Sequence, residues 1–200
     1  MKKTPLQKSP SRRSPPYAAI LMGAGLVILG IVSGLLLSDP QPNSAALQQT
    51  APGEPLSVVP VEVNFAAPEI SLTNLDGVEV ALADLRGQVV LVNNWATWCP
   101  PCKAEMPTLQ TYFEEHQDQG FVLVAIDAAD PVGEVRQFVA DYGLTFPVWL
   151  DPQNKALMAF QNQSLPSSYV IDRLGMVRLA WTGAISKSML ERYLTPLLEE

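Results

Sequence analysis

The sequence predicts an α/β fold in which helices cover both faces of a mixed central sheet. The apolar runs Val89–Trp95 and Phe121–Asp127 are typical of buried strands, and the helical spacing between them indicates a β-α-β unit with a right-handed parallel crossover. Two later strands, at 168–171 and 177–181, flank a turn that contains Gly175, which predicts an antiparallel hairpin. Residues 64–200 are long enough to bury a core of their own.

The remaining elements of this domain follow from hydrophobic spacing and from turn residues. Alternating residues on either side of the turn at 74–77 predict a β-hairpin within 70–85, which ends in a short helical turn before Gly87. A short strand is expected at 147–150. Helices are expected at 101–119, 132–142, 155–160 and 186–198, the last of them capped by Ser186.

The first 63 residues differ in composition from the rest. Residues 1–16 are mostly Pro, Ser, Lys and Arg with little to bury, so we expect a disordered basic tail. Residues 17–38 contain an uncharged apolar run that is long enough, as a helix, to span the ~30 Å hydrocarbon core of a bilayer. Five basic residues precede this run and none follows it before Arg86. The positive-inside rule therefore predicts a single-pass cell-membrane protein with a cytoplasmic N-terminus and an extracytoplasmic catalytic domain.

A cleaved signal peptide is the alternative interpretation of residues 17–38. The apolar run is longer than the core of a usual signal peptide, and the best cleavage candidate, Ser44-Ala45-Ala46, lies well downstream. We therefore expect an uncleaved anchor. Residues 39–63 contain five prolines among Ser, Ala and Gln, which predicts a semi-extended linker that holds the domain away from the bilayer.

The charge of the outer part excludes some partners. All 20 acidic residues follow Ser38 together with eight of the 13 basic ones, so this part carries a formal charge of −12. Such a surface argues against binding to nucleic acid or to an anionic membrane surface. A single pair of cysteines in an exported domain indicates a redox-active pair, since a domain stabilised by disulfides would contain more cysteines.

Both cysteines, Cys99 and Cys102, lie where the strand pattern changes to a helical one. A thiolate at a helix N-terminus faces unpaired backbone N–H groups and the positive end of the helix dipole, which stabilise it as a nucleophile. Cys102, one turn into the helix, would face the interior and resolve a mixed disulfide. The alternatives are a static disulfide or half of a zinc site. A zinc site needs about four ligands, and beyond the cysteines the chain offers one histidine, His116, which we expect to be solvated.

The run from Val92 to Pro107, with Trp95-Ala96-Thr97-Trp98-Cys99-Pro100-Pro101-Cys102 at its centre, resembles the active-site signature of membrane-anchored thioredoxin-like proteins of the TlpA/ResA/CcmG group. The resemblance begins near Phe65, continues through Leu85-Arg86-Gly87 and covers about two-thirds of the chain. It implies a thioredoxin-like fold with an added N-terminal β-hairpin.

The same resemblance implies several site residues. Leu165 and Pro166 match the loop in which these folds hold a cis-proline opposite the cysteines, although from the sequence alone Pro166 is equally an ordinary proline at the start of a strand. Trp98, Pro100, Leu165 and Pro166 are expected to contact the substrate. Glu105 matches a glutamate that could pass protons during exchange; the other interpretation is an exposed first-turn glutamate that interacts with the helix dipole.

Two departures from the family patterns concern the active-site strand. Asn93 occupies the position of a buried Asp in cytosolic thioredoxin, so that proton acceptor is absent and Glu105 becomes the stronger candidate. Asn94 replaces the aromatic residue usual in the group. Trp95 is expected in the core, whereas Trp98 is expected to flank the disulfide.

The leading hypothesis is a thiol–disulfide oxidoreductase that uses a Cys99/Cys102 dithiol–disulfide cycle. By resemblance it is a reductase of protein disulfides, with apocytochrome c thiols as a substrate in cytochrome c maturation and a membrane dithiol protein as electron donor. We expect a monomer with no cofactor and no metal. The alternatives are a disulfide-forming oxidase, a thioredoxin-like copper-delivery protein, and a peptide-binding module with an inert cysteine pair.

Overall fold

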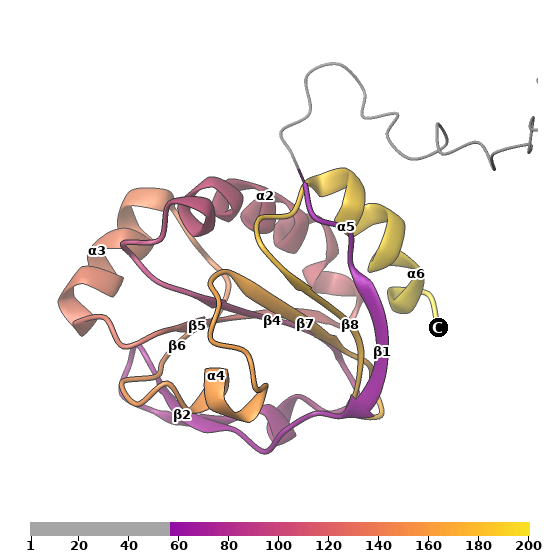
Figure 1. The fold of residues 1–200 in the computed structure, drawn as a ribbon, viewed down its shortest axis with the longest axis horizontal. Helices are drawn as coiled ribbons and strands as arrows, with labels where there is room; N and C mark the ends of the chain where they lie inside the picture. Colours follow the sequence, from indigo (N-terminus) through magenta and orange to yellow (C-terminus); the bar gives the residue numbers. More distant parts are fainter. Residues whose placement is uncertain (1–56) are drawn as a thin grey trace, which may run out of the picture. The chain divides into compact units, whose positions relative to one another are not determined.

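A computed structural model describes residues 57–200 of the chain, and within that range eight strands form one mixed sheet. The order across the sheet is β1-β8-β7-β4-β5-β6-β2-β3 (Figure 1). The strands are β1 (Val61–Ala66), β2 (Ser71–Asn74), β3 (Glu79–Ala81), β4 (Val89–Trp95), β5 (Phe121–Asp127), β6 (Val148–Leu150), β7 (Ser167–Ile171) and β8 (Met176–Thr182). The predicted mixed α/β architecture is confirmed, including the hairpin of β2 and β3 and that of β7 and β8.

The centre of the sheet is the predicted β-α-β unit. β4 and β5 pair in parallel from Val89 opposite Phe121 to Trp95 opposite Asp127, and helix α2 (Pro100–His116) connects them. Every residue of β4 is buried because other elements cover both faces of this strand, which explains its continuous apolar run. Helix α3 (Val132–Tyr142) connects β5 to the parallel strand β6, and it ends at the left-handed Gly143.

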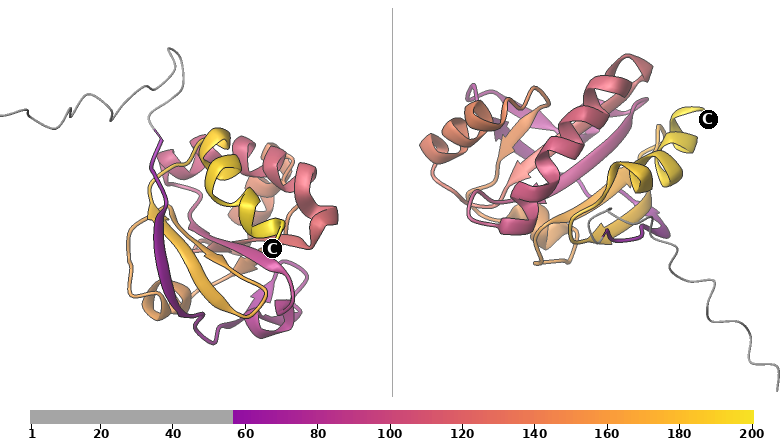
Figure 2. Two further views of the ribbon diagram at one scale, coloured as in Figure 1. Left: turned by 90° about the vertical axis from the view of Figure 1, so that its right-hand side faces the viewer. Right: turned by 90° about the horizontal axis from the view of Figure 1, so that it is seen from above.

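Helices cover both faces of the sheet, as the two hydrophobic clusters show. Side chains from α2 and α3 pack on one face with residues of two C-terminal helices, α5 (Lys187–Tyr193) and α6 (Thr195–Leu198). The opposite face carries the short helix α4 (Lys155–Ala159) and the 3₁₀ turn η2 (Leu82–Leu85) (Figures 1 and 2). Because both crossovers are right-handed and advance in the same direction, α2 and α3 lie on the same face.

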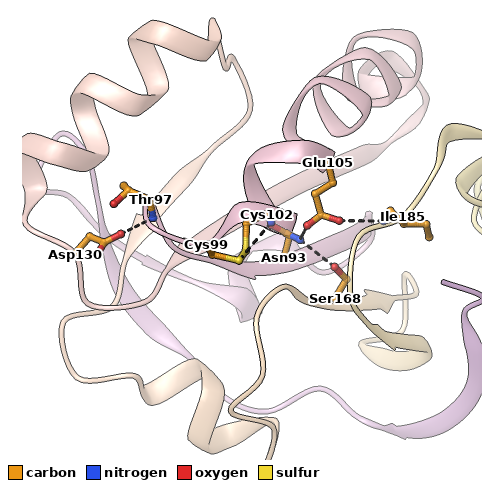
Figure 3. The surroundings of a disulfide bond; sticks show 8 residues. All are labelled: Asn93, Thr97, Cys99, Cys102, Glu105, Asp130, Ser168 and Ile185. Atoms are coloured by element: carbon orange, nitrogen blue, oxygen red, sulfur yellow. Dashed lines mark hydrogen bonds between the residues drawn. A yellow bond between two sulfur atoms is a disulfide. The ribbon is translucent and has the colours of Figure 1, made fainter. Parts of the chain in front are cut away.

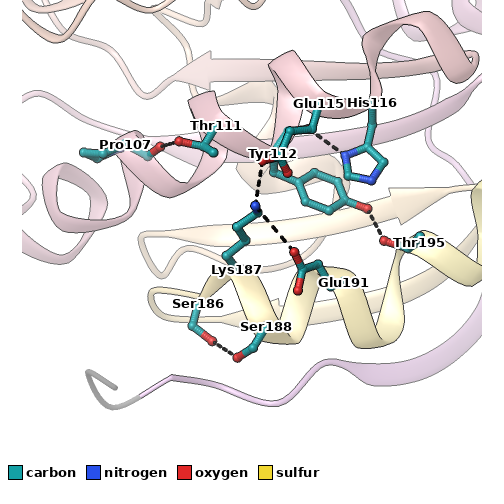
Figure 4. A network of polar contacts seen from close by, with 10 residues as sticks. All are labelled: Pro107, Thr111, Tyr112, Glu115, His116, Ser186, Lys187, Ser188, Glu191 and Thr195. Atoms are coloured by element: carbon teal, nitrogen blue, oxygen red, sulfur yellow. Dashed lines mark hydrogen bonds and ion pairs between the residues drawn. The ribbon is translucent and has the colours of Figure 1, made fainter. Parts of the chain in front are cut away.

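A polar network attaches the C-terminal helices to α2 (Figure 4). The Lys187 ammonium group contacts the carboxylates of Glu115 at 2.6 Å and Glu191 at 3.5 Å. The Tyr112 hydroxyl lies 2.9 Å from that of Thr195, and burial raises the pKa of Tyr112 to about 12. These contacts hold α5 and α6 against the C-terminal half of α2.

The structure departs from the sequence-based expectations at three places. β1 begins at Val61, inside the range assigned to the linker; as an exposed edge strand it lacks the burial pattern that reveals a strand. The helix expected at 186–198 is two helices, because Pro196 has no N–H to continue the hydrogen-bond ladder. Ser186 is the N-cap residue of α5, but its hydroxyl contacts that of Ser188 rather than a backbone amide.

His116 is also placed differently from the expectation. It is half-buried rather than solvated, since its ring stacks on Tyr112 and its Nδ1 lies 2.9 Å from the Tyr112 carbonyl oxygen. The helix expected at 101–119 ends here as α2, and the 3₁₀ turn η3 (Gln117–Gln119) follows.

The predicted basic tail at 1–16 and the predicted membrane anchor at 17–38 lie outside the described residues. Among residues 57–200, no helix is long and apolar enough to cross a membrane.

Candidate active site

The candidate site lies at one edge of the sheet, where three segments meet. The parallel strands β4 and β5 end there, at Trp95 and Asp127, and β7 begins there at Ser167 because it runs antiparallel to β4. The loops that follow β4 and β5 and the loop that precedes β7 therefore come together. Ligand-binding and catalytic groups in α/β proteins typically gather at the carboxyl ends of such strands.

Cys99 and Cys102 form a disulfide at this edge, with their Cα atoms 5.3 Å apart (Figure 3). Cys99 is the N-cap residue of α2, and its sulfur accepts a hydrogen bond from the Cys102 amide at 3.3 Å. A helix N-terminal amide thus points at the Cys99 sulfur, as predicted, and the same donor would stabilise the thiolate after reduction. Cys102 is fully buried in the core cluster that lies between α2 and the sheet.

The predicted substrate-contacting residues lie in two of the segments that meet at this edge of the sheet. The Trp98 side chain, directly before Cys99, is 66% exposed, and Pro100 directly after it is exposed as well. Leu165 is half-buried, Pro166 is buried, and the peptide bond between them is cis. Trp95, as expected, is fully buried in the core.

Glu105 lies one turn after Cys102 on α2 and is only 1% exposed, so the interpretation as an exposed first-turn glutamate is wrong. Its Oε1 accepts a hydrogen bond from Asn93 Nδ2 at 2.8 Å, and its Oε2 accepts one from the Ile185 amide at 3.2 Å (Figure 3). Asn93 Nδ2 also donates to Ser168 Oγ at 3.0 Å. Asn93 of β4 and the Ile185 amide before α5 therefore hold the carboxyl group, and Ser168 of β7 holds Asn93.

The pKa of Glu105 is raised to about 7, since burial penalises the ionised form more than its two hydrogen bonds favour it. A carboxyl group with such a pKa takes up and releases protons near neutral pH, whereas an ordinary one is fully ionised there. Sequence reasoning singled out Glu105 and Asn93 but missed Ser168 and the Ile185 amide. A backbone donor carries no sequence signal.

A second pair of carboxyl groups was also missed. Asp130, in the loop after β5, accepts a hydrogen bond from the Thr97 amide at 2.6 Å. Asp127, the last residue of β5, is 1% exposed and accepts a hydrogen bond from the Asp130 amide at 3.0 Å. Burial raises the pKa of Asp127 to about 7. Two acidic residues at the end of a buried strand were the signal that could have indicated them.

Within residues 57–200, no group of three or more His, Cys, Asp and Glu side chains is placed to hold a metal ion. The cysteine pair is the reactive centre that this part of the chain offers.

Comparison with known proteins assigns the chain to a family. The family model described as AhpC/TSA matches residues 63–180, a range that includes the cysteines, Glu105 and Pro166. The chain belongs to the AhpC/TSA family. Its domain is thus thioredoxin-like, as the resemblance implied, and the expected fold is confirmed.

The relatives of this family member are thiol–disulfide oxidoreductases. The chain is 38% identical over 134 residues to thiol–disulfide oxidoreductase ResA of Geobacillus kaustophilus, a match that covers 67% of this chain and 77% of the relative. It is 34% identical over 128 residues to ResA of Bacillus subtilis, covering 64% and 72%.

A solved structure agrees with these relatives. A thiol:disulfide interchange protein of the thioredoxin family from Chlorobium tepidum superposes with a TM-score of 0.62 at 28% identity, covering 69% of this chain and 99% of that one. The chain is therefore a thiol–disulfide oxidoreductase of the TlpA/ResA/CcmG group.

Proposed function

We propose that this oxidoreductase works as a reductase of protein disulfides outside the cytoplasmic membrane, with disulfide-linked apocytochrome c as a substrate. The observation that carries the proposal is the pairing of a helix-capping Cys99 with a buried carboxyl group, Glu105, one turn beyond Cys102. The first is suited to attack a disulfide, and the second is suited to take up the proton that the resolving thiol must lose.

The reaction begins with both cysteines reduced. The Cys99 thiolate attacks one sulfur of the target disulfide, a new S–S bond joins enzyme and target, and the other target sulfur leaves as a thiolate that takes a proton from water. Cys102 then attacks Cys99 Sγ, which releases the second target thiolate and leaves the Cys99–Cys102 disulfide. Two electrons have passed from the enzyme dithiol to the target disulfide.

Glu105 acts in the second step. Cys102 is fully buried, so water does not readily take its proton, and a thiol attacks only as a thiolate. Ionised Glu105 accepts that proton and becomes a neutral acid, a form that its burial favours. The Asn93 and Ile185 donors hold the carboxyl group in place throughout. In the reverse direction, when a donor reduces the disulfide, Glu105 returns the proton to Cys102.

The oxidised enzyme must be reduced again for a second turnover. A membrane-embedded dithiol protein that carries electrons from the cytoplasm is the class of donor that we propose. The apolar run at 17–38 would anchor the chain beside such a donor, with the basic residues 1–16 in the cytoplasm. The outer domain would then face its substrates at the outer surface.

The test uses the full chain in detergent, reduced and freed of excess reductant, mixed with an apocytochrome c peptide whose Cys-x-x-Cys-His thiols are linked as a disulfide. We expect one peptide disulfide to be reduced for each chain, as counted by alkylation and mass spectrometry. The Cys99→Ser variant is the control and should reduce none. Formation of a disulfide in the reduced peptide by the oxidised chain, with no reaction in the forward direction, would contradict the proposal.

Topology is tested separately in cells that express the chain. Cys99 of a Cys102→Ser variant should react with a membrane-impermeant maleimide in intact spheroplasts, and the domain should stay in the membrane fraction after high-salt washing. Labelling only after lysis would overturn the extracytoplasmic location, and release into the soluble fraction would indicate a cleaved leader instead of an anchor.

A further inference from the structure

The loop at residues 127–131 contacts the active-site segment from the side opposite Glu105. β5 and β7 flank β4 on its two sides, so the loop after β5 and the Glu105 network reach the cysteines from different directions (Figure 3). The proposed reaction uses groups on the Glu105 side only. The β5 side holds two carboxyl groups and an unusual backbone conformation that the reaction steps leave unexplained.

Two hydrogen bonds join this loop to the segment that carries Cys99, and a third lies within the loop. The Thr97 amide donates to Asp130 Oδ2 at 2.6 Å, which is short for an N–H···O bond and typical of a charged acceptor. The Asp130 amide donates to the buried Asp127 Oδ1 at 3.0 Å. The Ala128 amide donates to the Trp95 carbonyl oxygen at 2.8 Å, so the loop is bound to this segment at Trp95 and at Thr97.

The backbone between the two aspartates is in a disfavoured conformation. Ala129 has a φ of 69°, a left-handed region that residues with a Cβ rarely adopt. This turn directs the Asp130 carboxylate back toward Thr97. Backbone of this kind persists where the surrounding structure holds it, and it often occurs at functional sites.

We propose that Asp130 is a positioning residue for thiol–disulfide exchange, which holds the Thr97 amide and thereby fixes the path of Trp98 and Cys99 toward the target disulfide. The inference rests on the exchange activity of this site. Attack on a disulfide requires Cys99 Sγ to lie along the S–S axis of the target, and a segment free to rotate at Thr97 would satisfy that geometry less often. Asp127 supports the arrangement by holding the Asp130 amide.

Two variants separate the hydrogen bond from the charge. Asp130→Asn and Asp130→Ala both remove the negative charge, but Asn keeps an oxygen that can accept from the Thr97 amide. We expect the reduced full-length Asp130→Ala variant to react with a small disulfide, 5,5′-dithiobis(2-nitrobenzoate), about tenfold more slowly than Asp130→Asn in stopped-flow measurements. The reduction potentials of the two variants should agree, because positioning changes the rate rather than the equilibrium.

A spectroscopic readout accompanies the rates. Trp98 is the exposed one of the four tryptophans, so acrylamide quenching reports mainly on it. Quenching should increase in Asp130→Ala and stay at the wild-type level in Asp130→Asn. Equal rates and equal quenching for the two variants would overturn the proposal.

A measurement on the wild-type chain keeps the test independent of variant folding. In ¹⁵N-labelled protein, the Thr97 amide should exchange with solvent at least tenfold more slowly than the Trp98 amide, which donates to no acceptor within residues 57–200. Exchange of the Thr97 amide as fast as that of the Trp98 amide would contradict a stable hydrogen bond between the Thr97 amide and Asp130. Because a small disulfide is the probe, these results stand even if the apocytochrome peptide proves not to be a substrate.

Discussion

Asn93 and Glu105 are twelve residues apart in the chain, yet Asn93 Nδ2 donates a hydrogen bond to Glu105 Oε1 at 2.8 Å in the interior of the domain. A buried carboxyl group with a neutral amide for a partner, rather than a cation, keeps its proton to higher pH than an exposed one. Burial raises the pKa of Glu105 and the Asn93 hydrogen bond lowers it by a smaller amount, so the carboxyl group exchanges protons near neutral pH. Several measurable consequences follow from this contact and from the rest of the site.

The free energy of unfolding should fall as the pH rises through neutrality. The pKa of Glu105 is raised from 4.5 to about 7 on folding, so the folded chain binds this proton more tightly than the unfolded chain does. Protonated Glu105 therefore adds on the order of 3 kcal/mol to the free energy of unfolding. This contribution is fully present below about pH 4.5 and is lost as the pH rises through about 7. Urea unfolding of the oxidised protein from pH 4 to pH 9 measures it.

The matched control is Glu105→Gln, which cannot ionise and should flatten part of this pH dependence. Asp127, with a pKa also raised to about 7, should account for a further part, and Asp127→Asn should remove it. An unchanged slope in both variants would show that neither carboxyl group is protonated in the folded chain at pH 5.

Exchange kinetics should respond to Glu105 in the step that uses Cys102. Glu105→Gln should slow the release of target thiols on the order of 10²-fold, the lower end of the range for general acid–base catalysis. The first attack by Cys99 should change by less than about threefold, since α2 still presents the Cys102 amide to its sulfur. Rapid-quench separation of mixed disulfide from product distinguishes the two steps; equal slowing of both would argue against a specific role for Glu105.

Removing the resolving thiol should trap the substrate. Cys102→Ser should form a stable mixed disulfide through Cys99, visible on non-reducing gels and lost with dithiothreitol. Cys99→Ser should trap almost nothing, because Cys102 is fully buried. Trapping through Cys102 instead would reverse the assigned roles.

The contact between α2 and α6 should contribute modestly to stability. Tyr112→Phe removes the hydroxyl that lies 2.9 Å from Thr195 Oγ1 and should lower the free energy of unfolding by about 1 kcal/mol. Thr195→Val removes the other partner, and a double-mutant cycle isolates the interaction. Fully additive effects of the two substitutions would mean that the hydroxyls do not interact.

Relief of the left-handed residue should stabilise the protein. Ala129→Gly keeps both aspartates and removes the Cβ that disfavours a φ of 69°. An increase of about 1 kcal/mol in the free energy of unfolding is expected, measured in urea. A decrease would indicate that the extra freedom of glycine in the unfolded chain outweighs the relief.

The sequence predicted the central strands of the sheet more accurately than its edge strands. β4 and β5 matched their predicted bounds because continuous apolar runs between turn signals mark strands buried on both faces. β1 escaped prediction because an exposed edge strand next to prolines resembles a linker. The cysteine pair was found from spacing alone, whereas the hydrogen bond from the Ile185 amide to Glu105 joins residues 80 apart and depends on packing that no local pattern encodes.

The most direct test of the reductase assignment is the equilibrium reduction potential of the Cys99–Cys102 pair in the full chain, measured in detergent against glutathione and dithiothreitol buffers. A reductase fed by a membrane dithiol donor should give a value near that of thioredoxin, ~−270 mV. A value near ~−120 mV, that of a strong disulfide-forming oxidant, would contradict the proposed direction of electron flow.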